Sequence, residues 1–328
     1  MAEINHHVNL SWRSKSFKLS AILLIFGLVL LYGIIPNIHS MFGLELHLRL
    51  PSQPRYLIAS TLIFYANFLL ASTSYKFLAI KKLKFMHILL VELSSAPLGL
   101  LFPAGIGGIS INYLFLRSKQ ISHTASGLIV ALNNTLGILG NLSLLALLVV
   151  IFGINSKLLN LFVQHKDIFT LVLLGFVLIL MFLILFLNSN HVFAQRMKRN
   201  LLAAFNYYRY SNQWLRLIGA YSCAVAQALV TALAFWLALK AFDVYLSYPL
   251  AFLIYSLSVL VGGFIPTPGG LGGVEASLVT SIVALHGANT SLALSAVLGY
   301  RAISYWLPAA TGSLALYFVR KMRLVKFS

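Results

Sequence analysis

The sequence predicts an all-α polytopic membrane protein with about six full spans and two re-entrant helical hairpins arranged as an inverted repeat. Three observations support this prediction: the composition, the placement of the basic residues, and a Gly/Pro-rich motif that occurs twice. Of the 328 residues, 60% are hydrophobic and only 9% are charged, whereas an ordinary soluble domain has about 25% charged residues. We therefore expect one integral membrane domain over 1–328, with repeat halves of about 1–165 and 166–328.

Several apolar runs are long enough to cross a bilayer, since a helix needs about 20 residues to span a hydrocarbon core of ~30 Å. Examples are "LSAILLIFGLVLLYGIIP" (19–36) and "IFTLVLLGFVLILMFLILFL" (168–187). The first run is longer than the apolar core of a typical signal peptide, and no small-residue cleavage site follows it. We expect it to be a retained span.

The net charge of +18 is interpreted as a topology signal rather than as a nucleic-acid site, because the basic residues flank the apolar runs. Such anchors also attract anionic lipid headgroups. This pattern predicts a multi-pass protein of the cell inner membrane with cytoplasmic N- and C-termini. The clusters are Arg13/Lys15/Lys18, Lys76/Lys81/Lys82/Lys84, Arg117/Lys119, Arg196/Lys198/Arg199/Arg209/Arg216 and Arg320/Lys321/Arg323/Lys326.

If all five clusters lie on the cytoplasmic side, two segments must enter the membrane and return to the side from which they came. These are 85–116, which begins and ends inside, and 250–286, which begins and ends outside. The basic stretch 188–216 is expected on the cytoplasmic surface. The predicted full spans are 19–36, 56–80, a helix within 123–153, 168–187, 217–239 and a helix within 291–319.

Each predicted hairpin turns at a Gly/Pro-rich motif. "PAGIGGI" (103–109) aligns with "PGGLGGV" (268–274) at an offset of 165, with four identities in seven positions. Proline ends a helix and glycine permits positive φ and close backbone approach. Interrupted segments at corresponding places in two halves are typical of inverted-repeat transporters. We therefore expect two hairpin tips that approach the membrane midplane from opposite faces.

The hairpin tips are the predicted binding site. Exposed backbone inside a membrane is tolerated where it is buried in protein or lines a wet cavity, and the N–H groups that begin a half-helix favour an anion. A phosphate-bearing substrate is therefore expected. The candidate tip residues are Gly105, Gly107, Pro268, Gly269, Gly270 and Gly272.

Three ionisable residues lie within apolar segments, where charge is costly and is a functional candidate by default. Glu275 follows the second tip and Arg301 lies in the last helix, at depths that allow pairing. Either the pair fixes the hairpin against the last helix, or Arg301 binds a lipid phosphate as a fork while Glu275 orients it or receives a cationic headgroup or a proton. Glu92 either belongs to the binding site or caps hydrogen bonds beside Ser94 and Ser95.

Catalytic and cofactor signals are missing from the sequence. The nine histidines show no metal-ligand spacing, and there is no P-loop and no Gly-x-Ser-x-Gly motif. We expect no metal site, no cofactor and no enzymatic activity.

The motif "PTPGGLGGVEASLV" (266–279), followed by "AVLGYRAISYWLPAATGSLAL" (296–316), resembles the transmembrane region of lysylphosphatidylglycerol synthetases and their stand-alone, flippase-like relatives. In that family the membrane region is associated with moving aminoacylated phosphatidylglycerol between leaflets, and a separate soluble domain makes the lipid. The resemblance therefore implies the translocating part without the synthetic part. The matched positions are Pro268, Gly269, Gly270, Gly272, Glu275 and Arg301.

The first repeat departs from the family pattern. Relatives often carry an acidic residue and a downstream arginine after this turn, whereas this chain has the uncharged "GGISIN" (107–112). The headgroup of the substrate is therefore left open.

The leading hypothesis is a translocase for an anionic phospholipid, an aminoacyl-phospholipid or a lipid-linked precursor. Two alternatives remain: a membrane subunit that positions a separately encoded glycosyltransferase or lipid synthase, and an ion-coupled transporter of a small solute. The expected partners are membrane lipids through an anionic headgroup, with a homo-oligomer or a partner synthase left open and no nucleic acid.

Overall fold

The computed structural model describes most of the central and C-terminal parts of the chain. The described residues are 48–79, 81–102, 106–152, 195, 214–263 and 270–325. The predicted spans 19–36 and 168–187 lie outside them, as do the tip residues Gly105, Pro268 and Gly269. The chain divides into two units, Met1–Arg49 and Leu50–Ser328, and every helix below belongs to the second unit.

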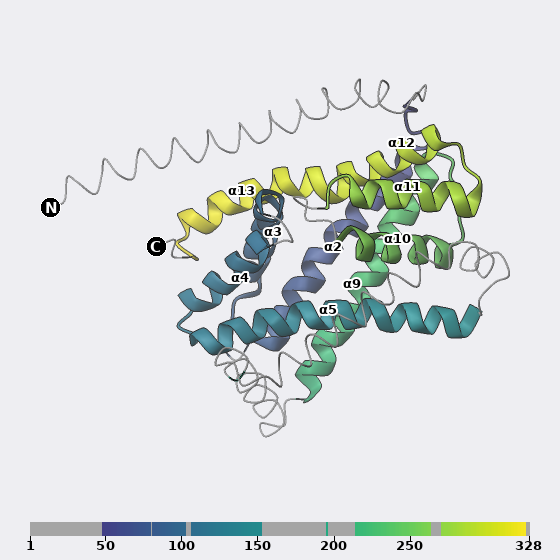
Figure 1. Cartoon of the computed structure of the whole chain (residues 1–328). Helices are drawn as coiled ribbons and strands as arrows, with labels where there is room; N and C mark the ends of the chain where they lie inside the picture. Colours follow the sequence, from purple (N-terminus) through teal and green to yellow (C-terminus); the bar gives the residue numbers. More distant parts are fainter. Residues whose placement is uncertain are drawn as a thin grey trace. The chain divides into compact units, whose positions relative to one another are not determined.

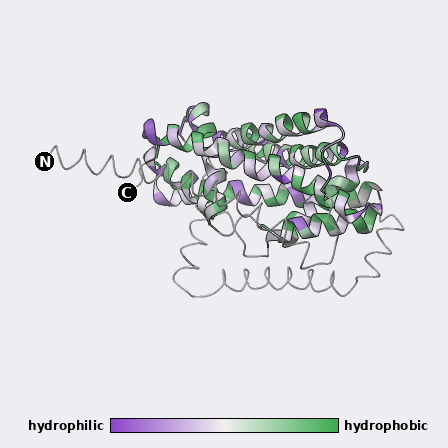
Figure 2. Ribbon diagram, turned by 90° about the horizontal axis from the view of Figure 1, so that it is seen from above, coloured by the Kyte–Doolittle hydropathy of each residue, from purple (hydrophilic) through white to green (hydrophobic). Residues whose placement is uncertain are grey.

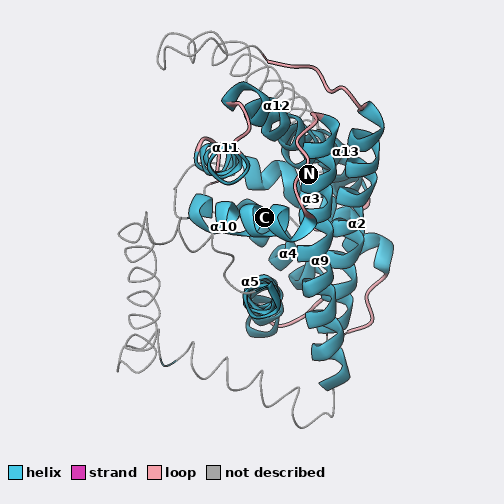
Figure 3. Ribbon diagram, turned by 90° about the vertical axis from the view of Figure 1, so that its right-hand side faces the viewer, coloured by secondary structure: helices cyan, strands magenta, loops and turns pink. Residues whose placement is uncertain are grey.

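The described part of this unit consists of helices joined by turns and short loops, and no strand occurs within it (Figure 3). A five-residue π-helical segment, η1, joins the last two α-helices into one continuous rod. The elements are α2 (Pro54–Leu78), α3 (Phe85–Leu101), α4 (Ile106–Ser118), α5 (His123–Phe152), α9 (Trp214–Ala241), α10 (Tyr248–Gly263), α11 (Gly273–His286), α12 (Thr290–Arg301), η1 (Ala302–Trp306) and α13 (Leu307–Lys321).

Four helices in the described residues are long and apolar enough to cross a membrane. Apolar residues, coloured green, recur along the helices (Figure 2), and some large apolar side chains are exposed, such as those of Leu62 and Leu314. Helices that are apolar around most of their circumference suit a lipid environment. The four spans predicted at 56–80, within 123–153, 217–239 and within 291–319 are therefore confirmed as helices. Their apolar stretches are Pro54–Leu78, His123–Leu148, Trp214–Ala241 and Thr290–Lys321.

The two predicted hairpins are each built from a pair of short helices. The arms α3 and α4 have 17 and 13 residues, and the arms α10 and α11 have 16 and 14, fewer than the roughly 20 needed for a full span. The arms of each pair pack against each other. Both interruptions fall at the Gly/Pro motifs, so the predicted positions of the two helix breaks are confirmed.

The order and lengths of the described elements repeat along the chain. When the bounds of α2, α3, α4 and α5 are shifted by 165 residues, they fall within five residues of the bounds of α9, α10, α11 and the α12–α13 rod, respectively. This offset is the one that aligns the two Gly/Pro motifs.

One end of the unit, which we call the basic end, carries the base of the first hairpin. There Lys81 Nζ donates to the Lys119 carbonyl at 3.4 Å, and Arg216 at the start of α9 donates to the Ala79 carbonyl at 3.2 Å. The Ser118 hydroxyl donates to the Leu324 carbonyl beyond α13. The end of α2, the start of α9, the end of α13 and the first hairpin base therefore lie together.

The opposite end joins the start of α2 to the end of α9. The Gln53 N–H donates to the Ala241 carbonyl at 3.2 Å, and the Gln53 side chain donates to the Tyr245 hydroxyl at 2.6 Å. Trp236 Nε1 donates to the Leu246 carbonyl at 2.7 Å, just before α10 begins. The second hairpin therefore has its base at this end, so the two hairpins enter the helix bundle from opposite ends (Figure 1).

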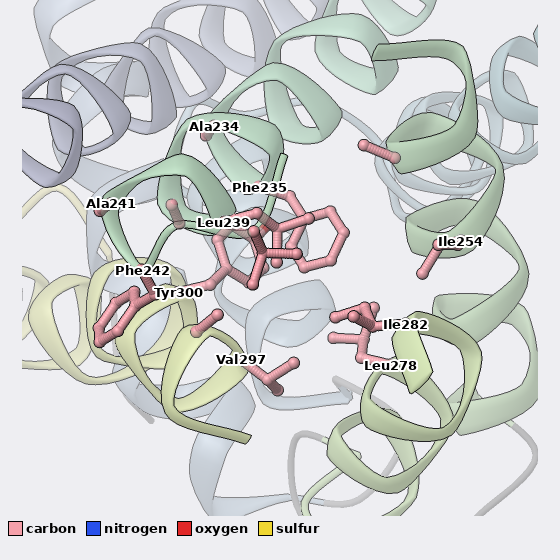
Figure 4. Close-up of a cluster of buried hydrophobic side chains, with 14 of the residues drawn as sticks. Ala234, Phe235, Leu239, Ala241, Phe242, Ile254, Leu278, Ile282, Val297 and Tyr300 are labelled. Atoms are coloured by element: carbon pink, nitrogen blue, oxygen red, sulfur yellow. The ribbon is translucent and has the colours of Figure 1, made fainter. Parts of the chain in front are cut away.

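The core between the second hairpin and its neighbours is apolar (Figure 4). Side chains from α9, α10, α11 and α12 meet there with little or no solvent exposure. Phe235 and Tyr300 pack edge to face with their centroids 5.1 Å apart, an arrangement that aromatic rings favour. This core holds α11 beside α12, and so fixes the position of the start of α11 relative to the polar residues of the last helix.

Candidate functional site

The central polar feature of the second half is an ion pair between Glu275 and Arg301. Arg301 Nε donates to Glu275 Oε1 at 2.5 Å, and the two side chains are only 14% (Glu275) and 12% (Arg301) exposed. It is the one salt bridge among the residues that the structure describes. The structure therefore brings together the two ionisable residues whose depths allowed pairing.

Glu275 also fixes the start of α11. Its second oxygen, Oε2, accepts a hydrogen bond from the Gly272 N–H at 2.8 Å. Gly272 has φ +85°, a conformation that glycine adopts at no steric cost. A carboxylate in the first turn of a helix interacts favourably with the helix dipole. Glu275 therefore balances two positive influences, the guanidinium of Arg301 and the N-terminus of α11.

Arg301 is the last α-helical residue before the π-helical segment η1. Its Cζ lies 4.5 Å from the centroid of the Tyr305 ring, so the guanidinium is held by a carboxylate and by a cation–π contact. Short π-helical segments inside α-helices occur frequently at functional sites. The planar guanidinium is the group best suited to bind a phosphate with two parallel hydrogen bonds.

Further hydroxyl groups lie beside Arg301 in the same helix. Within the described residues, the Tyr300 hydroxyl and Ser304 Oγ are buried without a hydrogen-bond partner. A buried polar atom without a partner is costly, and it is often explained by a water or ligand. The Tyr300 ring itself packs against Phe235 and Tyr255.

Glu92 lies in the first hairpin and is not part of the ion pair. It is 8% exposed, and its Oε1 has no hydrogen-bond partner among the described residues. The hydroxyl groups of the two neighbouring serines bond backbone carbonyls. Ser94 Oγ donates to the Val91 carbonyl at 2.7 Å, and Ser95 Oγ donates to the backbone carbonyl of Glu92 at 2.6 Å.

The described tip glycines differ in what they do locally. Gly270 and Gly272 have positive φ, 69° and 85°, so the turn before α11 requires glycine. Gly107 is buried between the arms of the first hairpin, where a Cβ would overlap the carbonyl oxygen of Leu98. Its structural role is close packing of α3 on α4. That these glycines contact a substrate stays a prediction.

Two contacts of the site were not predicted from the sequence. The spacing Gly272-x-x-Glu275 matches the glutamate half of a capping box, and it would have predicted the hydrogen bond to the Gly272 N–H. Tyr305 lies four residues after Arg301, which is the spacing of side-chain neighbours on a helix. No sequence signal identifies the π-helical segment between them.

A family comparison now identifies the kind of protein to which this geometry belongs. The family described as the lysylphosphatidylglycerol synthase TM region matches residues 16–312. The chain belongs to this family. The match covers most of the chain, including both hairpins, Glu275 and Arg301, and with the four long apolar helices it establishes a multi-pass membrane protein of a lipid-related family. A search of curated proteins found no match to the chain.

Proposed function

We propose that the protein is a lipid translocase that moves an anionic phospholipid, an aminoacyl-phospholipid or a lipid-linked precursor between leaflets, and that it synthesises no lipid itself. The observation that carries the proposal is the Glu275–Arg301 pair, largely shielded from solvent at the N-terminus of a half-helix directly after a hairpin break. Family membership supports a lipid-related function in the membrane.

The physical argument starts from the cost of moving a charged headgroup through hydrocarbon, which is at least several kcal/mol on insertion scales. A half-helix N-terminus favours an anion, and an arginine binds phosphate through charge-assisted hydrogen bonds. In the structure Glu275 holds the positions that a phosphate would compete for: the Arg301 Nε proton and the Gly272 N–H. A passing headgroup phosphate therefore exchanges with the Glu275 carboxylate for the same donors.

The arrangement of the hairpins supports an alternating path across the membrane. The 165-residue repeat of the described elements and the hairpin bases at opposite ends favour an inverted repeat, the architecture in which substrate sites lie near the midplane. We assign the basic end to the cytoplasm of the inner membrane because Lys and Arg are enriched in cytoplasmic loops. With the span expected at 19–36, this orientation supports cytoplasmic N- and C-termini.

The test is lipid translocation by the purified full chain in proteoliposomes. Headgroup-labelled anionic lipids are placed in both leaflets, and a membrane-impermeant quencher reports how fast the inner pool reaches the outer leaflet. We expect faster exchange than in protein-free vesicles for an anionic lipid, with a smaller effect on a zwitterionic one. Folded protein that accelerates no anionic lipid, with or without ion gradients, would favour a membrane subunit that positions another enzyme.

Arg301→Lys tests the role of the guanidinium in the same assay. Lysine keeps the positive charge but loses the planar fork and the stacking surface, so we expect slower translocation from a folded protein. Arg320→Lys, on the exposed C-terminal turn of the same rod, is the matched control and should keep the parent rate. Equal rates for the parent and both variants would refute the phosphate-binding role of Arg301.

A further inference from the structure

The first hairpin contains a buried carboxyl group with no counter-charge among the described residues. Glu92 lies in the middle of α3, and its side-chain atom Oε1 has no hydrogen-bond partner there. No salt bridge joins Glu92 to any described Lys, Arg or His. Glu275, by contrast, bonds both the Arg301 guanidinium and a backbone N–H.

Polar side chains from two packed helices, α4 and α2, lie near Glu92. Asn112 on α4 faces its carboxyl group, and Tyr75 on α2 is close enough to interact with its charge. Tyr75 in turn interacts with Asn133 on α5, whose Oδ1 accepts a hydrogen bond from Ser74 Oγ at 2.7 Å. These side chains form a polar path inside the bundle, which we call the Tyr75 path.

The Tyr75 path leads toward the basic end. Ser74 and Tyr75 lie in the last turn of α2, whose end is joined to the start of α9 by the Arg216 contact. Glu92 is seven residues into α3, which places it about 10 Å along the helix from its start at a rise of 1.5 Å per residue. The carboxyl group is therefore within reach of solution through a few side chains.

Other ionisable groups on the packed helices are directed elsewhere or lie nearer the basic end. On α4, Arg117 donates to the Ile121 carbonyl and bonds His123, and the Tyr113 hydroxyl bonds the same histidine. On α3 itself, His87 lies in the first turn. The ionisable residues of α13 are Tyr317, Arg320 and Lys321, all in its second half. Tyr75 is the titratable group that interacts with Glu92.

We propose that Glu92 is a proton-binding site, loaded from the basic end along the Tyr75 path, and that its protonation is coupled to lipid translocation. An ionised carboxylate buried away from water needs a counter-ion or a full set of donors, and the described surroundings provide neither. A proton supplies the missing charge: it binds the carboxylate oxygen and converts it to a neutral carboxyl, and its departure restores the anion. The coupling rests on the proposed function, whereas the proton site does not.

The contact between α3 and α13 provides the physical connection to the Arg301 site. Gly312 of α13 lies so close to α3 that a Cβ there would overlap the Leu93 carbonyl oxygen, and Leu93 is the residue after Glu92. Gly312 belongs to the same rod as Arg301, 11 residues away, or about 16 Å along a helix. A shift of α3 that accompanies charging of Glu92 is therefore passed directly to the rod that carries Arg301.

The direct test is infrared difference spectroscopy of the full chain in lipid nanodiscs as pH is changed. A protonated buried carboxyl gives a carbonyl stretch separate from that of an ionised carboxylate. We expect such a band to titrate in the parent, to be absent in Glu92→Gln, and to persist in Asp243→Asn, where the altered carboxylate is an exposed one. A band that is unchanged in Glu92→Gln would overturn the proposal, and so would a band removed by Na⁺ at constant pH.

A second variant covers the case in which Glu92→Gln does not fold. Tyr75→Phe keeps the ring but removes the hydroxyl of the path, and we expect it to shift the midpoint of the same band; an unchanged midpoint would refute the path. Translocation then tests the coupling. A pH gradient should change the parent rate and leave the Glu92→Gln rate unaffected, and a parent rate that is independent of the gradient would overturn the coupling. Absence of any translocation by the parent would refute the proposed function and leave the infrared result standing.

Discussion

Neutralising Glu275 alone should destabilise the protein more than neutralising Glu275 and Arg301 together. The change Glu275→Gln keeps an acceptor oxygen for the Gly272 N–H, so the helix cap is retained while the charge is removed. The Arg301 guanidinium, 12% exposed, is then left without its carboxylate. Breaking a buried pair by removing one partner costs about 3 to 5 kcal/mol, and the slight exposure of both side chains favours the lower figure, about 3 kcal/mol.

The double change Glu275→Gln and Arg301→Gln removes both charges. Replacing both partners of a buried pair is often close to neutral, so we expect a loss of about 0 to 2 kcal/mol. The second substitution therefore rescues the first. That range includes the loss of the cation–π contact with Tyr305 at 4.5 Å, which contributes about 0.5 to 2 kcal/mol.

The measurement is a double-mutant cycle on the free energy of unfolding, with all four proteins in the same detergent or nanodisc. Arg301→Gln alone completes the cycle and leaves Glu275 paired only with the N-terminus of α11. A coupling energy of several tenths of a kcal/mol or less, with the double variant as unstable as the sum of the two single variants, would refute the reading of this contact as a buried ion pair.

Three further predictions follow from other parts of the fold. Gly312→Ala should lower the free energy of unfolding by about 1 to 3 kcal/mol relative to Gly137→Ala, since a Cβ overlaps α3 at the first position and meets nothing within 4 Å at the second; equal stabilities would contradict the close approach. Hydrogen bonds from the Ser52, Gln53 and Tyr245 side chains lower the pKa of Asp243. The ionised Asp243 therefore stabilises the fold at pH values above the ordinary pKa of an aspartate, and this stabilisation is lost as the pH falls through the lowered pKa. The thermal unfolding temperature of the parent should therefore fall more steeply below about pH 4 than that of Asp243→Asn. Parallel pH profiles of the two proteins would contradict this prediction. Single cysteines at Gln120 and Ala288, in a background without other cysteines, should react from the cytoplasmic and external sides respectively; labelling from one side would exclude opposed hairpins.

Much of the described fold was predictable because membranes impose strict lengths and charge placement. Both breaks were found from glycine and proline, and four spans from apolar run length. The Glu275–Arg301 pair was foreseeable from depth alone, since two opposite charges at similar depth in hydrocarbon have strong reason to meet. The missing counter-charge at Glu92 was not foreseeable, because it depends on which faces of α2, α4 and α13 turn toward α3. Those rotations are set by packing, such as Gly107 against Leu98, which no local pattern encodes.

The π-helical segment η1 changes the direction in which the side chains of α13 point relative to those of α12. A π turn holds one residue more than an α turn, so side chains after Trp306 are rotated by about 100° relative to a continuous α-helix. That offset lets one rod turn Arg301 toward the second hairpin and Gly312 toward the first. Deleting a single residue within Ala302–Trp306 would restore regular winding and swing Gly312 away from Leu93. The chain thus uses one extra residue as an angular spacer, so that a single helix faces both halves of the protein.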